Sequence, residues 1–138
     1  MNTALAIATI ALVVVAWVLL ERRRVGHEFE ETFRGRASLS DDDFYGKFYE
    51  GSGVSREVIV GVREVLAHEL QVDVSRMAPD DDFSRNLRFL LDSDSMMDVA
   101  LVEGLEKRFG IVISDREAEN TKTVNDIIVL VHGKSLVA

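Results

Sequence analysis

Residues 92–111 read DSDSMMDVALVEGLEKRFGI, an acidic stretch with serines followed by apolar residues at helical spacing. After Ser95 the large apolar residues recur every three or four positions, at Met96, Val99, Val102, Leu105 and Phe109. This spacing predicts an amphipathic helix whose apolar stripe faces a core. Ser95 stands at the start of that helix, where unpaired backbone N–H groups and the helix dipole favour a phosphate group. Ser and Asp are also preferred helix caps, and residue chemistry alone favours that role for Ser95.

The same stretch resembles the signature of acyl carrier proteins, which reads Asp-Ser-Leu, then a helix with an apolar stripe, then Glu-x-x-Phe-Gly-Ile. The matching residues are Asp94, Ser95, Glu106, Phe109, Gly110 and Ile111, and the similarity extends over about residues 55–132. The resemblance implies that Ser95 carries a 4′-phosphopantetheine arm whose terminal thiol holds acyl groups as thioesters. It also implies a carrier for fatty-acid, lipid or polyketide-type metabolism, and not an enzyme.

Partner recognition is where the sequence departs from the signature. Met96 replaces the usual Leu, which keeps an apolar side chain of similar volume, and the loop that leads to Ser95 is longer than usual. Residues with neutral or basic side chains replace carboxylates at Ala100, Lys107 and Arg108. We expect partner binding at Asp94, Met96, Met97, Glu103 and Glu106. The partners that the resemblance implies are a phosphopantetheinyl transferase and acyl-processing enzymes with basic docking faces.

The chain has 138 residues and no cysteine. This length allows one modest domain and an appendage, and any thiol chemistry must come from an attached group. Residues 1–24 contain three Arg and one Glu, so residues 25–138 keep 13 of the 16 basic and 23 of the 24 acidic side chains, a net charge of −10. A charge of this sign opposes nucleic-acid binding and favours basic partner surfaces.

Residues 3–20 carry no charged side chain. As a helix they would span about 27 Å, close to the roughly 30 Å of a bilayer core. We expect an uncleaved transmembrane anchor and no cleavable signal peptide, because no basic residue precedes the apolar run and no small-residue cleavage pattern precedes Glu21. Because the run is followed by Arg22, Arg23 and Arg24, the positive-inside rule places the C-terminal domain in the cytoplasm. The sequence therefore predicts a single-pass protein of the cytoplasmic membrane.

Three further helices complete the expected fold. Ser55 opens a helix with apolar residues at Val58, Ile59, Val62, Val65, Leu66 and Leu70. Ser114 and Glu117 predict a capping box for a short helix, and Thr123 starts a last helix for which Gly133 offers a stop. With the helix after Ser95 they predict an all-α, four-helix bundle of the acyl carrier protein kind, preceded by one transmembrane helix.

The expected organisation is an anchor with a basic flank over residues 1–24, a juxtamembrane linker over 25–54 and a carrier-like domain over 55–138. Within the linker, Ser40 and Asp43 predict a short helix whose aromatic residues either pack on the carrier-like domain or lie at the membrane surface, and packing is the favoured interpretation. The apolar residues at 87–91 predict a packed helical turn before Ser95. The acidic runs 41–43 and 80–82 are interpreted as solvated turns.

A metal site is not predicted. The spacing of a calcium-binding EF-hand loop is partly met by Asp92, Asp94, Asp98 and Glu103, but Met96 and Met97 stand where an oxygen ligand and a glycine are required. The histidines lack a second ligand at metal-binding spacing; they are His27, His68 and His132. The remaining alternative to a carrier is an unmodified, membrane-tethered interaction module with the same fold.

Overall fold

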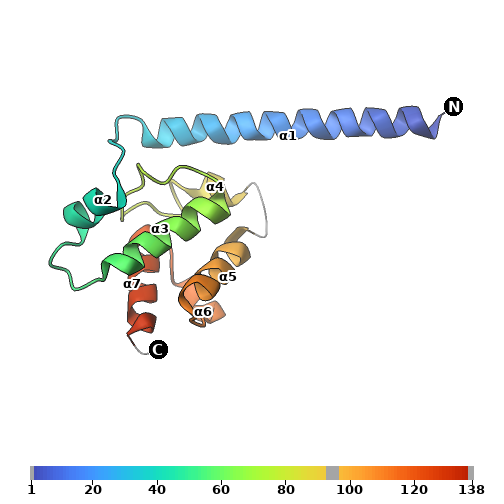
Figure 1. Cartoon of the computed structure of the whole chain (residues 1–138). Coiled ribbons are helices and arrows are strands. Elements are labelled where there is room, and N and C mark those ends of the chain that lie inside the picture. The colour runs from blue at the N-terminus through green and yellow to red at the C-terminus, as the bar shows by residue number, and fades with distance from the viewer. Residues whose placement is uncertain (1, 93–96, 137–138) are drawn as a thin grey trace. The chain divides into compact units, whose positions relative to one another are not determined.

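The structure, a computed structural model, describes residues 2–92 and 97–136 (Figure 1). These residues form the helices α1 (Thr3–Phe33), α2 (Asp41–Phe48), α3 (Arg56–Leu70), α4 (Arg88–Asp92), α5 (Met97–Phe109), α6 (Asp115–Glu119) and α7 (Val124–Ser135). No strand is present in the described part of the chain, where Asp82 and Thr123 make one isolated antiparallel bridge. The predicted all-α fold is confirmed.

The chain divides into two compact units, of which the first ends at Arg34 and the second begins at Gly35. Residues 25–33 continue α1, and α2 belongs to the second unit, so the segment expected as a linker contributes to both. Local pairs support the extension of α1: Glu21 and Arg24 form an ion pair of 2.8 Å, and the rings of Phe29 and Phe33 meet edge to face at 4.7 Å.

Helix α1 is long and apolar enough to cross a membrane, and no other helix in the described ranges meets that criterion. Its 31 residues correspond to a length of about 46 Å, which exceeds the roughly 30 Å of a bilayer core. The apolar side chains of residues 5–20 are exposed along the helix.

The second unit is built around α3, against which α2, α5 and α7 all pack (Figure 1). Helix α5 also contacts α7. The apolar stripe expected on α3 is buried, and α7 also buries an apolar face. The most enclosed side chains of these two helices are Ile59, Val62, Leu66, Val124, Ile128 and Val131. These helices follow the expected pattern because their apolar residues keep to the i, i+3, i+4 spacing of one helical face.

The expected stripe of α5 is wrong in part. Leu105 is buried as expected, but the other buried residue of this helix is Leu101. The side chains of Val102 and Phe109 are only half-buried, and Val99 is 41% exposed. A step of three residues falls about 60° short of a full helical turn, so two such steps place Val99 about 120° from Leu105 around the helix. Leu101 is four residues from Leu105 and stays on its face. Met96 lies outside the described residues.

Helix caps form where the sequence placed them. The hydroxyl oxygens of Ser40, Ser55 and Ser114 accept the N–H groups of residues 43, 58 and 117, and Ser114 completes its capping box with Glu117. Thr123 caps α7. Gly133 does not end α7, which continues to Ser135, because this glycine lacks the positive φ of a helix-terminating residue.

The stretch before α5 is packed, as expected from its apolar residues. The buried side chains are Leu87, Phe89 and Leu90, and residues 88–92 form α4. The backbone of the preceding loop is tied to the start of α7: Phe83 N–H donates to Lys122 O at 2.8 Å, and Val124 N–H donates to Asp81 O at 3.0 Å. The loop therefore has a fixed course up to α4.

Candidate functional site

Ser95 was expected to be the attachment residue, and it lies outside the described residues together with Asp94 and Met96. On either side of it in the chain, α4 ends at Asp92 and α5 begins at Met97. Position 95 is therefore three residues after the end of α4 and two residues before α5 in the sequence. Both flanking carboxylates, Asp92 and Asp98, are exposed.

The start of α5 fits a phosphate diester on a serine. The helix has 13 residues in the described part of the chain, and the first turn of an α-helix in general offers backbone N–H groups that lack intrahelical acceptors. The helix dipole adds partial positive charge at this end, which stabilises an attached anion. The Asp98 carboxylate accepts one of these groups, the N–H of Val99, at 2.9 Å.

Two of the expected partner-binding residues have side chains that a partner can reach. Glu103 is exposed on α5, and Met97 is half-buried at its first position. The carboxylate of Asp92 is near a basic group of α4, with 3.6 Å between Arg88 Nε and Asp92 Oδ1. In the described ranges, no three or more His, Asp or Glu side chains are grouped to hold a metal ion.

Glu106 makes a contact within the domain that the sequence did not predict. Its side chain is half-buried, and Oε1 accepts the N–H of Ile113 at 2.8 Å. The backbone oxygen of Glu106 accepts the N–H groups of Gly110 and Ile111 at 2.8 and 3.2 Å. Glu106 therefore holds the chain as it leaves α5. The only sequence signal of this role is the Glu-x-x-Phe-Gly-Ile pattern itself.

The remaining residues of that pattern turn the chain into the core. Gly110 has a φ of 64°, a left-handed conformation that costs little only for glycine. This turn directs Ile111 to a buried position. The pattern is thus explained by a helix end that needs an internal acceptor, a left-handed residue and an apolar anchor.

The same C-terminal end of α5 is fitted closely to α3. A Cβ atom added at Gly61 would lie 2.5 Å from Cζ of Phe109, so the aromatic ring occupies the space that a side chain at position 61 would need. Nε of Arg108 is 3.4 Å from Oε2 of Glu64, which adds an exposed ion pair between the two helices. Gly61 was not identified from the sequence, because nothing near it in the chain indicates the approach of Phe109.

The comparisons with known proteins agree with this arrangement. The family described as "Phosphopantetheine attachment site" matches residues 60–131, which is more than half of the chain and includes position 95. The acyl carrier protein of Thermosynechococcus vestitus is 35% identical over 78 residues, 56% of this chain and 91% of that protein. Those of Myxococcus xanthus and Micrococcus luteus are each 31% identical over 77 residues, 56% of this chain, and 92% and 90% of the relatives. The chain therefore belongs to the acyl carrier protein family, and its covalent cofactor is 4′-phosphopantetheine.

Proposed function

We propose that Ser95 bears the 4′-phosphopantetheine of this acyl carrier protein. The observation that carries the proposal is the position of residue 95 in the chain, within the matched range and two residues before the start of α5. The start of α5 stabilises a phosphate there. The attached arm supplies the thiol that holds acyl groups as thioesters. The chain has no cysteine, so its own side chains cannot supply this thiol. Acyl carrier proteins are carriers, and the proposed cargo is an acyl group of fatty-acid, lipid or polyketide-type metabolism.

Proteins of this family work with a phosphopantetheinyl transferase and with acyl-processing enzymes. For this chain we propose a docking surface formed by Glu103 and Met97 of α5, together with Asp94 and Met96. The negative charge of the domain supports partners with basic faces. Glu106 contributes less to docking, because its carboxylate is engaged by Ile113 N–H.

Intact mass after coexpression with a broad-specificity phosphopantetheinyl transferase tests the attachment. Wild-type protein should gain the mass of one arm, and Ser95→Ala should gain none. Ser93→Ala is the matched control, since Ser93 also follows an aspartate, and it should be modified like the wild type. Absence of the arm from wild-type protein with several transferases would leave the unmodified interaction module as the better reading.

We also propose that α1 anchors the carrier in the cytoplasmic membrane. The support is the exposed apolar surface of residues 5–20 and a helix long enough to span the bilayer. The full-length protein should sediment with membranes in high salt and be extracted by detergent. Deletion of residues 1–20 should release it into the soluble fraction. Release of the intact chain by salt alone would contradict the anchor.

The proposed orientation places the carrier domain in the cytoplasm. The basic residues Arg22, Arg23 and Arg24 follow the apolar run, and such residues resist translocation. Attachment of the arm also requires contact with coenzyme A and the transferase. A reporter fused after Ala138 should be active only if it functions in the cytoplasm. Activity of a reporter that functions only outside the cytoplasm would contradict this orientation.

A further inference from the structure

Residues 35–54, here called the strap, lie before the range matched by the family and pack on the carrier domain through α2. Phe44 and Tyr49 of the strap are buried. Arg63 of α3 is also buried; it forms an ion pair with Asp41 and donates to Leu39 O at 2.9 Å. The strap is thus part of the folded domain and not a loose connection.

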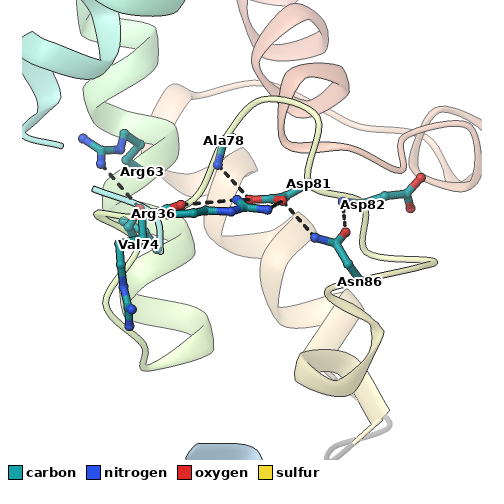
Figure 2. Close-up of polar contacts among 8 residues, drawn as sticks. Arg36, Arg63, Val74, Ala78, Asp81, Asp82 and Asn86 are labelled. Atoms are coloured by element: carbon teal, nitrogen blue, oxygen red, sulfur yellow. Dashed lines mark hydrogen bonds and ion pairs between the residues drawn. The ribbon is translucent and has the colours of Figure 1, made fainter. Parts of the chain in front are cut away.

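A second ion pair joins the strap to the loop that precedes α4. Nη1 and Nη2 of Arg36 donate to Oδ2 and Oδ1 of Asp81 at 2.7 and 2.9 Å, in the two-bond geometry that favours arginine (Figure 2). The Asp81 side chain is only 3% exposed. The reading of residues 80–82 as a solvated turn is therefore wrong for Asp81, because this carboxylate has an internal partner from a distant part of the chain.

Asp81 also organises its own loop. Oδ2 accepts the N–H of Ala78 at 2.7 Å, and Oδ1 accepts Nδ2 of Asn86 at 2.8 Å. Asn86 in turn accepts the N–H of Asp82 at 2.8 Å through Oδ1. Figure 2 shows Arg36, Ala78 and Asn86 converging on this one carboxylate. A buried carboxylate is stable only with such partners, so loss of Arg36 would leave an uncompensated negative charge in the loop.

The loop leads directly to the attachment segment. Leu87 N–H donates to Asp82 O at 2.9 Å, and the Leu87 side chain is fully buried. Helix α4 starts at the next residue and ends three residues before Ser95. A change in the course of the loop at Asp81 would therefore move α4, the helix that precedes the attachment residue in the chain.

We propose that Arg36 is a positioning residue for the attachment of 4′-phosphopantetheine, acting through Asp81 and Asn86 on α4. This inference rests on the proposed role of Ser95. The ion pair keeps the loop in one conformation, and a transferase binds that conformation. When only a fraction of the molecules adopts this conformation, the apparent affinity for the transferase is the intrinsic affinity multiplied by that fraction, and the rate of the chemical step is unchanged.

The test compares Arg36→Met, Arg36→Lys and Arg56→Met in the full-length protein in detergent. Arg56 is the matched control, because its ion pair also joins the strap to another part of the domain. Arg56 belongs to α3, and its Nε donates to Asp42 Oδ1 at 2.6 Å on the exposed surface, in a contact that does not involve Asp81. Arg36→Met should raise the KM for transfer at least fivefold with kcat within twofold. It should also speed amide hydrogen exchange in residues 82–92. Arg36→Lys should recover part of both effects, and Arg56→Met should show neither.

Several results would overturn the inference. One is a wild-type KM and wild-type exchange for Arg36→Met; another is a KM that rises only in proportion to the unfolded fraction measured by circular dichroism. If Arg36→Met does not fold, the double variant Arg36→Met with Asp81→Asn removes the unpaired charge; it should fold and still show the raised KM. If the wild type accepts no arm, the proposed function fails, while the exchange comparison of wild type with Arg36→Met still decides whether the coupling exists.

Discussion

The phenol of Tyr49 donates a 2.7 Å hydrogen bond to Oδ1 of Asn125, which joins the residue after α2 to the first turn of α7. Tyr49 is only 5% exposed. Burial, with a smaller contribution from the negative charge of Asp80, raises the pKa of Tyr49 from 10 to about 12. The folded state therefore keeps its proton at pH values where the unfolded chain loses it.

This pKa shift predicts an alkaline loss of stability. The contribution of Tyr49 is fully present below pH 10 and disappears as the pH rises toward about 12, because only the unfolded state ionises in that window. The expected change is on the order of 1–2 kcal/mol. Tyr49→Phe should remove it in denaturation measured at pH 9 and 11.5. Equal pH dependence for wild type and Tyr49→Phe would contradict this assignment.

The strap should be required for the stability of the carrier domain. A chain of residues 35–138 is expected to melt more than about 10 °C above a chain of residues 55–138, because the shorter chain loses the buried side chains of Phe44 and Tyr49, each contributing about 1.5–3 kcal/mol. Thermal unfolding followed by circular dichroism measures the difference. Equal melting temperatures would show that the strap is dispensable for folding.

The buried face of α5 predicts an order of mutational effects. Leu101→Ala and Leu105→Ala should each lower the free energy of unfolding by about 2–5 kcal/mol, since both side chains are buried. Val99→Ala, at an exposed position, should cost less than about 1 kcal/mol. Phe109→Ala should fall between them because its ring is half-buried against Gly61. Urea denaturation gives these values, and a larger effect at Val99 than at Leu101 would contradict the observed helix orientation.

Glu106 separates stability from partner binding. Glu106→Gln keeps an oxygen acceptor for Ile113 N–H and should leave the unfolding free energy within about 0.5 kcal/mol, while Glu106→Ala should lower it by about 1–3 kcal/mol. If docking depends mainly on the charge of Glu103, Glu103→Gln should weaken transferase binding more than Glu106→Gln does. Unfolding and binding titrations on the same variants check both statements. Weaker transferase binding by Glu106→Gln than by Glu103→Gln would show that Glu106 belongs to the docking surface.

The features that sequence predicts well here are local. The caps at Ser40, Ser55 and Ser114 depend on a residue and its neighbour three positions later, and both were visible in the chain. The prediction that Ser95 is the attachment residue depends on the same kind of signal, the residues next to it in the chain. The α5 face was partly wrong because repeated steps of three drift around a helix, and the drift is decided only by what packs against it.

The strap contacts had no local signal. Arg36 and Asp81 are 45 positions apart, and Tyr49 and Asn125 are 76 apart. In the chain, Asp81 has the same appearance as its acidic neighbours, and only its depth in the folded domain distinguishes it. Such long-range pairs depend on how separated segments pack, which hydrophobic spacing within one segment does not determine.

The most direct test of the account is a fragment mass spectrum of the full-length protein recovered from cell membranes. The peptide that contains residues 93–97 should carry one 4′-phosphopantetheine, and the fragment ions should place it on Ser95 and not on Ser93. That result, from protein that sediments with membranes, would support the carrier site and the anchor together. An arm on Ser93, or an unmodified peptide from cells with an active transferase, would contradict the central claim.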